Sequence, residues 1–233
     1  MNLFEVVSAE WLPLLLAALF AYLLGSISPA ILVGRLFAKT DIRTMGSGNA
    51  GATNVLRSLG AVPALLTTLG DLTKSILSVL LGQWLVNHLG EAINSTRGDL
   101  IAMYVAGAFC IIGHLYPLYY GFRGGKGVMA TLGMMLVLDW RVALTALAFF
   151  IVVVSMTQYV SLGSMLAGVV MTLATFVYRF YFDKFSLAYA LGCAAASGLI
   201  AAMVILKHRA NILRLLNGTE SKISIGKEKK KEH

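Results

Sequence analysis

The chain has 233 residues, of which 58% are hydrophobic and 13% charged, and its mean hydropathy is +0.78. Soluble domains are about 45–50% apolar and about 25% charged, so this composition excludes an ordinary soluble domain. The net charge of +8 does not indicate a nucleic-acid partner, because +5 of it lies between Lys207 and the end, where there are eight Lys or Arg and three acidic residues. Such a segment is typical of a cytoplasmic tail beside anionic lipids.

Long apolar runs predict membrane-crossing helices, because about 20 apolar residues span the hydrocarbon as a helix. The fourth and fifth runs are short, and Asp139 and Arg141 lie between them. We predict an all-α, polytopic membrane helical bundle that forms one domain over residues 1–220, followed by a basic tail over 221–233. The seven expected spans are 12–34, 61–86, 100–120, 128–138, 142–156, 162–182 and 185–206.

The charges of the connecting segments predict the orientation of the bundle. Segment 35–57 contains four basic residues and one acidic residue, whereas segment 87–99 contains one basic and two acidic residues. Cytoplasmic loops are enriched in Lys and Arg. Seven spans with the N-terminus outside therefore place 35–57, 121–127 and the C-terminus in the cytoplasm. No basic segment precedes the first run, which is therefore expected to be a retained span and not a signal peptide.

A first polar segment, GSGNAGATN at 46–54, follows the first apolar run, and Arg57 comes three residues later. Its glycines let backbone N–H groups turn towards one point, its Ser, Asn and Thr side chains add short donors, and Arg57 adds a fixed charge. An anion site is one interpretation, and a solvated turn is the other. The candidate residues are Gly46, Ser47, Gly48, Asn49, Thr53, Asn54 and Arg57.

A second polar segment, FRGGKGV at 122–128, leads into the fourth apolar run. Gly124, Gly125 and Gly127 around Lys126 combine backbone donors with a point charge at a helix N-terminus, which favours an anionic ligand. The spacing is not that of a Walker A loop. A cytoplasmic turn whose basic residues only set the topology is the alternative. The nearby His114 is expected to be a structural residue.

Further polar residues occur towards the end of the chain. His208 and Asn211 share a helix face at i, i+3 spacing, with Arg214 at its edge, although cations also suit a helix C-terminus. Ser161 and Ser164 share a face at the start of the sixth span, where they would donate to an anion or to backbone. The remaining polar groups predict structural roles: an ion pair between Asp71 and Lys74, a basic partner for Glu220, and buried thiols at Cys110 and Cys193 without metal-ligand spacing.

Together these segments resemble, in order, the motifs of the acyl-phosphate:glycerol-3-phosphate acyltransferase family, of the bacterial PlsY type. GSGNAGATNVLR at 46–57 is similar to its first motif and GHLYPLYYGFRGGKGV at 113–128 to its second. YVSLGS at 159–164 and HRANILRLLNGTE at 208–220 are similar to the remainder. The similarity extends from about residue 20 to residue 220, and the four segments in register are far more specific than any one of them.

The resemblance implies transfer of a fatty acyl group from acyl phosphate to the 1-hydroxyl of glycerol 3-phosphate, giving 1-acylglycerol 3-phosphate and phosphate in phospholipid synthesis. It implies a bacterial inner-membrane enzyme, monomeric among membrane lipids, with a cytoplasmic active site and neither cofactor nor metal. Carried over by position, the active site comprises Ser47, Arg57, Lys126, a serine of the 161/164 pair, His208 and Asn211. Ser47 is expected to bind phosphate, and either His208 or a substrate phosphate to serve as general base.

Two other functions share some of these sequence features. A small transporter of an anionic phosphorylated metabolite would share basic, glycine-rich sites, but transporters often have repeated halves and a site at the midplane, and this chain has no matching halves. An acyltransferase of the His-x4-Asp type is excluded, because none of His88, His114 and His208 has an Asp five residues later.

Overall fold

The computed structural model describes residues 10–90 and 96–223, and all regular elements in these ranges are helices. Contacts group the chain into two compact units, unit 1 (Met1–Leu144) and unit 2 (Thr145–His233), and each is described by itself. The single domain over 1–220 stays a prediction. Most of the predicted tail over 221–233 lies outside the described residues.

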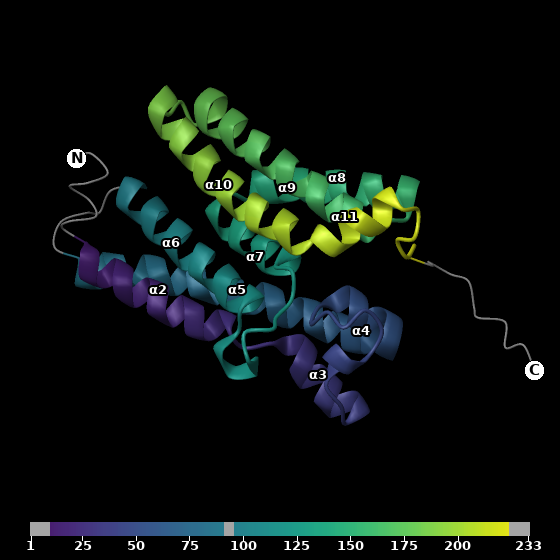
Figure 1. Cartoon of the computed structure of the whole chain (residues 1–233). Helices are drawn as coiled ribbons and strands as arrows, with labels where there is room; N and C mark the ends of the chain where they lie inside the picture. Colours follow the sequence, from purple (N-terminus) through teal and green to yellow (C-terminus); the bar gives the residue numbers. More distant parts are fainter. Residues whose placement is uncertain (1–9, 91–95, 224–233) are drawn as a thin grey trace, which may run out of the picture. The chain divides into compact units, whose positions relative to one another are not determined.

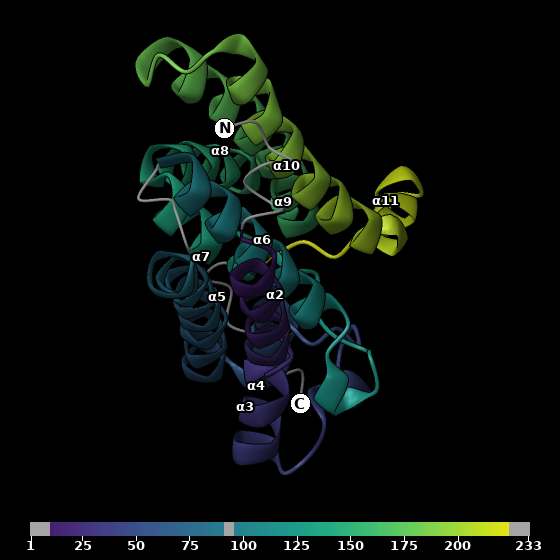
Figure 2. The same cartoon turned by 90° about the vertical axis from the view of Figure 1, so that its left-hand side faces the viewer.

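Three long helices form the centre of unit 1: α2 (Trp11–Gly25), α5 (Ala61–Leu89) and α6 (Thr96–Leu115), which contact one another and lie side by side in Figures 1 and 2. Close approach requires small residues, since a Cβ on Gly25 would collide with the backbone of Cys110 in α6. The remaining elements are α3 (Pro29–Ala38), η1 (Ile42–Thr44), α4 (Ala52–Leu59), η2 (Leu118–Tyr120) and α7 (Val128–Leu138).

The predicted first span, 12–34, is wrong as one continuous helix. The chain breaks between α2 and α3, and Pro29 stands at the first position of α3, where its missing N–H and fixed φ are tolerated. The carbonyl of Ile27 in the break accepts a hydrogen bond from Lys74 Nζ at 2.8 Å instead of from a helical N–H. The two helices together still form an apolar stretch long enough to cross a membrane, Trp11–Ala38.

Unit 2 is built around two packed helices, α9 (Val160–Val177) and α10 (Leu187–Lys207), which are neighbours in Figures 1 and 2. A π-helical turn, η3 (Tyr178–Phe182), extends α9, and the short α11 (Arg209–Leu216) follows α10. Helix α8 (Trp140–Thr157) begins at the end of unit 1 and continues into unit 2.

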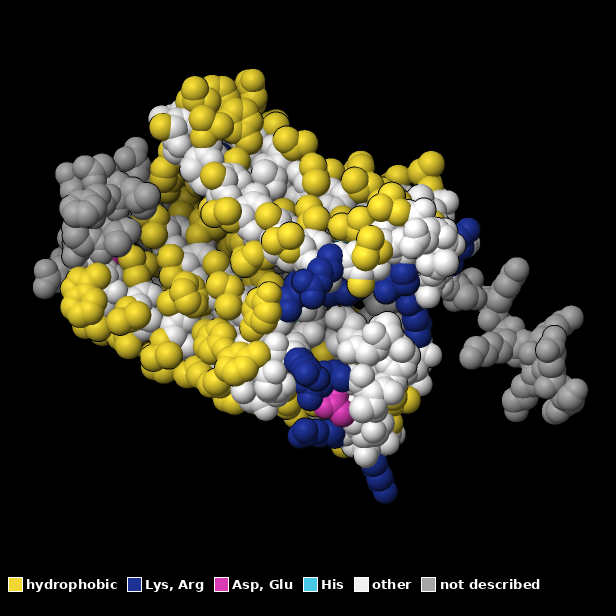
Figure 3. Space-filling view, in the orientation of Figure 1, with side chains coloured by type: hydrophobic (Ala, Val, Ile, Leu, Met, Phe, Trp, Pro, Cys, Tyr) yellow, Lys and Arg dark blue, Asp and Glu magenta, His cyan; other side chains and the backbone are white. Residues whose placement is uncertain are grey.

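Among the described residues, six helical stretches are long and apolar enough to cross a membrane, and Val128–Leu138 is a shorter apolar helix. The predicted helical bundle of about seven spans is therefore confirmed, whereas its orientation stays a prediction. Large apolar side chains are exposed along α2, including Leu15 and Leu19, and hydrophobic side chains cover this helix in Figure 3. Lipid would cover such a surface. Basic side chains gather instead at the end of unit 1 that carries α3.

Candidate active site

The first polar segment forms a loop whose shape is held by one buried amide. Asn54, 2% exposed, accepts a hydrogen bond from the backbone N–H of Ser47 at 2.8 Å and donates to the carbonyls of Ile42 and Met45 at 3.1 and 3.0 Å. Gly46 has φ +53°, a conformation that L side chains rarely adopt, and a Cβ there would collide with the Asn54 amide. Asn54 therefore serves the loop by holding its backbone, while Ser47 stays exposed.

The second polar segment is folded tightly over the end of α6. The Gly125 N–H donates to the carbonyl of His114 at 3.1 Å. A Cβ on Gly124 would collide with that carbonyl, and one on Gly125 would collide with the His114 ring and with the carbonyl of Ala50. Only glycine fits these two positions. Lys126, the next residue, is half-buried.

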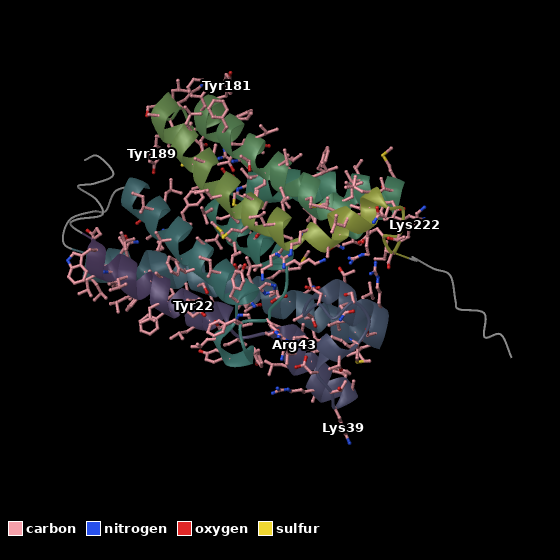
Figure 4. The ribbon with its side chains drawn as sticks, viewed as in Figure 1. Tyr22, Lys39, Arg43, Tyr181, Tyr189 and Lys222 are labelled. Carbon is pink, nitrogen blue, oxygen red and sulfur yellow. The ribbon has the colours of Figure 1, made fainter. Side chains whose placement is uncertain are left out.

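The two loops are in contact within unit 1. Ala50 belongs to the first loop, so the close approach of Gly125 to its carbonyl joins the loops directly. A second connection is Arg43, labelled in Figure 4, whose Nη1 donates to the carbonyls of Tyr120 and Arg123 at 2.7 and 3.1 Å. The loops are thereby fixed against each other.

Arg43 is itself held by Asp41, through its backbone N–H, Nε and Nη2 at distances between 2.7 and 3.1 Å. These hydrogen bonds and the adjacent charge lower the pKa of the Asp41 carboxyl despite partial burial, and the pKa of Arg43 is raised in return. No motif in the sequence indicates this pair. Its local signal is an acidic and a basic residue at i, i+2, and the contacts across 77 and 80 residues leave no mark in the sequence.

A cavity of about 620 Å³ opens between the two loops, within the size range of small-ligand sites. Its charged side chains are two guanidinium groups and one carboxylate, so its lining is net positive. The lining residues are Asp41, Arg43, Thr44, Gly48, Tyr120, Gly121, Arg123 and Gly124.

The polar residues of unit 2 are organised around one carboxylate, that of Glu220. Its Oε1 accepts from Ser161 Oγ at 2.8 Å and from Asn211 Nδ2 at 2.7 Å, and its Oε2 forms an ion pair with Arg214 Nε at 2.7 Å. Burial opposes ionisation of this carboxyl, but the three donors together outweigh it and lower its pKa. The expected basic partner of Glu220 is confirmed. We name Ser161, Asn211, Arg214 and Glu220 the Glu220 cluster.

His208 stands in the turn between α10 and α11 and is 2% exposed. Its Nδ1 lies 2.8 Å from the carbonyl of Val204. Because a carbonyl only accepts, Nδ1 carries the proton, and the lone pair of a neutral ring is on Nε2. That nitrogen is the one able to accept a proton.

Several of the predicted residues already donate hydrogen bonds to acceptors within the protein. Ser164 donates to the carbonyl of Val160 in its own helix at 2.8 Å and is not part of the Glu220 cluster. The backbone N–H groups of Ser47, Gly48 and Gly125 already donate to protein acceptors, so they add less to an anion cradle than the sequence suggested. Among the described residues, no group of three or more His, Cys, Asp or Glu side chains is arranged to hold a metal ion.

The predicted residues of unit 1 lie in the two loops or in α4. Thr53 and Asn54 are in the first turn of α4 and Arg57 is in its last turn, whereas the loops contain Gly46, Ser47, Gly48, Asn49, Gly124, Gly125, Lys126 and Gly127. Ser161, Ser164, His208, Asn211 and Arg214 belong to unit 2.

The chain is similar to known glycerol-3-phosphate acyltransferases over most of its length. The family model described as glycerol-3-phosphate acyltransferase matches residues 15–218. A glycerol-3-phosphate acyltransferase of Clostridioides difficile (strain 630) is 43% identical, over 92% of this chain and 97% of its own, and one of Prochlorococcus marinus (strain MIT 9301) is 41% identical, over 88% and 94%. Crystal structures of PlsY (YgiH), an integral membrane glycerol 3-phosphate acyltransferase, in glycerol 3-phosphate and lysophosphatidic acid forms, match with TM-scores of 0.74 and 0.72. Both are 34% identical and cover 91% of this chain, and 96% and 95% of theirs.

Proposed function

This chain belongs to the glycerol-3-phosphate acyltransferase family, and from that premise we propose that its acyl donor is an acyl phosphate and its acceptor the 1-hydroxyl of glycerol 3-phosphate. It is an integral, multi-pass membrane acyltransferase. Its products are then 1-acylglycerol 3-phosphate and inorganic phosphate. The transporter considered from sequence has no support in these relatives, which are named as acyltransferases.

The observation that carries this proposal is the contact between the two glycine-rich loops of unit 1. The loops bring Ser47 and Lys126 to the same end of the unit, beside a net positive cavity. Both reactants contain phosphate, so a site for them needs several cationic or donor groups in one place. The glycines let the two loops pack closely, and Lys126, Arg43 and Arg123 lie in or beside these loops.

In the proposed reaction, the hydroxyl oxygen of glycerol 3-phosphate attacks the carbonyl carbon of the acyl phosphate. The new C–O bond forms, the C–O bond to phosphate breaks through a tetrahedral intermediate, and the hydroxyl proton passes to a base and then to the departing phosphate. Phosphate is a good leaving group, so orientation and stabilisation of negative charge supply most of the catalysis. Arg57 and Lys126 bind phosphate oxygens in this mechanism, and Ser47 donates to one of them.

The residues of unit 2 enter the same reaction as a base and as positioned donors. His208 accepts the hydroxyl proton at Nε2, or a substrate phosphate oxygen does so in its place. Asn211 donates to substrate from a fixed position, because its Nδ2 is held by Glu220 at 2.7 Å. A fixed donor costs little reorganisation when charge develops.

We place the reaction in the cytoplasmic leaflet of a bacterial inner membrane, with a monomeric enzyme as the working hypothesis. The basic end of unit 1 supports this orientation. Two exposed residues report the orientation: Tyr119 in η2, at the basic end, and Leu89 at the C-terminal end of α5. Each is replaced by cysteine in turn, and the native Cys110 and Cys193 are buried. A membrane-impermeant thiol reagent on intact cells should label Leu89→Cys alone. Labelling of Tyr119→Cys would refute the orientation.

The decisive test of donor and acceptor uses purified protein with acyl phosphate and labelled glycerol 3-phosphate, with acyl-CoA in a parallel reaction. Product is expected from acyl phosphate only. Lys126→Ala and Arg57→Ala should each lower kcat by about 100-fold or more. Lys39→Asn is the matched control, because Lys39 points away from the loops in Figure 4, and Asn tolerates its φ of +52°. Equal product from acyl-CoA would contradict the proposed donor.

A further inference from the structure

A buried network of ionisable groups in unit 1 has no part in the proposed chemistry. Asp71 and Lys74 in α5 form an ion pair with 2.9 Å between Oδ1 and Nζ, and both side chains are at most 6% exposed. His114 near the end of α6 completes it, with Nδ1 2.9 Å from Lys74 Nζ and 3.1 Å from Asp71 Oδ1. Ionisable groups at membrane depth are expensive and usually have a function.

The network joins three parts of unit 1 at one point. Lys74 Nζ has three neighbours at 2.8–2.9 Å: Asp71 Oδ1, His114 Nδ1 and the carbonyl of Ile27 in the break between α2 and α3. The three protons of the ammonium group match these three acceptors. A neutral His114 that accepts from Lys74 at Nδ1 carries its proton on Nε2, whereas one that donates from Nδ1 to Asp71 Oδ1 carries it on Nδ1. The ring is therefore held by the ion pair through Nδ1 and presents Nε2 on its other side.

The Nε2 side of His114 lies against the second loop. A Cβ on Gly125 would collide with Nε2, and the backbone N–H of Gly125 is bonded to the carbonyl of the same histidine at 3.1 Å. Gly125 also touches the carbonyl of Ala50 in the first loop. A continuous series of contacts thus runs from the buried ion pair through the imidazole to the point where the two loops meet.

We propose that Asp71, Lys74 and His114 are positioning residues, which hold the second loop against the first so that Lys126 and Ser47 face the reactants in the required geometry. The inference rests on the proposed role of Lys126. Misplacement of a catalytic group by about 1 Å can cost roughly 100-fold in rate, so a network that touches no substrate can still control turnover. A network that only stabilises the helices would change the melting temperature and leave the folded enzyme's kinetics unchanged.

His114→Asn tests the proposal most sharply. Asn places an amide near the position of Nδ1 and keeps a partner for the ion pair, but it removes the ring that contacts Gly125. We expect a melting temperature close to that of the parent protein and a fall of about 10- to 100-fold in kcat/KM for glycerol 3-phosphate, measured well below the melting temperature. Both kcat and KM should change. Thr67→Val is the matched control, because this buried hydroxyl of α5 bonds the Pro63 carbonyl of its own helix.

A second variant covers the case in which His114→Asn does not fold. The double variant Asp71→Asn/Lys74→Met removes both charges together, retains the imidazole and releases it from its anchor, and its kcat/KM should fall similarly. Folded protein with parental kcat and KM in either variant would overturn the positioning role. Lys126→Ala, assayed beside them, separates the two proposals: full activity there refutes the proposed site, whereas loss there with parental kinetics in His114→Asn refutes only the positioning.

Discussion

The two units hold their candidate residues in opposite ways. In unit 1 the main chain and one buried amide shape the loops, and the cavity beside them is lined by Arg43, Arg123 and the carboxylate of Asp41. In unit 2 the donors converge on a carboxylate of the protein itself, Glu220. The cavity lining of unit 1 is therefore net positive, whereas the donors of unit 2 are held in fixed positions by a carboxylate.

Removing the charge of Glu220 should give the largest change in stability. Glu220→Gln keeps the shape of the side chain but loses the charge that Ser161, Asn211 and Arg214 share. We expect a loss of about 2–3 kcal/mol in the free energy of unfolding, since hydrogen bonds to charged groups are the strong ones. Thermal unfolding in detergent measures it. An unchanged melting temperature would show that the Glu220 cluster does not organise unit 2.

The corresponding change in unit 1 is Asn54→Asp, which keeps an acceptor for the Ser47 N–H but turns a carboxylate oxygen towards the carbonyls of Ile42 and Met45. The loop should open, and kcat/KM for glycerol 3-phosphate should fall by about tenfold or more. Steady-state kinetics on folded protein measures this. Parental kinetics would mean that the loop does not depend on this amide.

The two units should also differ in their response to acid. The pKa of Glu220 is below its ordinary value of 4.5, so ionised Glu220 contributes stability above that value. This contribution is lost as the pH falls through the lower, folded-state pKa. The melting temperatures of the parent protein and Glu220→Gln should therefore converge in acid. A constant difference from neutral pH to below about pH 4 would contradict the origin given for the shift.

The smallest expected effect distinguishes two serines of one helix face. Ser161→Ala removes a donor to Glu220 and should cost about 1 kcal/mol. Ser164→Ala removes a bond within its own helix and should cost about 0.5 kcal/mol or less. Melting temperatures and turnover of the two variants are compared directly. A larger loss of stability for Ser164→Ala than for Ser161→Ala would contradict the roles given to the two serines.

Much of the fold follows from the sequence because local signals coincide with helix ends. The fourth span was predicted at its observed bounds, where Gly127 at φ +86° precedes α7 and Asp139 ends it. The break at residues 26–28 has a local signal, Pro29 directly after Ser28, but the run around it stays apolar and uncharged, so a single span was predicted. The carbonyl of Ile27 is satisfied by Lys74, far away in the sequence.

The candidate site was predictable in composition but not in its connections. Glycine and basic residues indicated both loops, and Glu220 was expected to have a basic partner. Two sets of hydrogen bonds join distant segments of the chain. Arg43 donates to the carbonyls of Tyr120 and Arg123, and Lys74 contacts His114. Such contacts arise from helix packing, which no local pattern in one sequence records.

The central proposal is that Lys126 of unit 1 and Asn211 of unit 2 act in the same reaction step. The most direct measurement is kcat/KM for the parent protein, Lys126→Ala, Asn211→Ala and the double variant, with acyl phosphate as donor. Residues that act as one catalytic group are strongly non-additive, so the loss in the double variant should be well below the product of the single losses. Losses that multiply, or an Asn211→Ala enzyme with parental kcat/KM, would contradict the account.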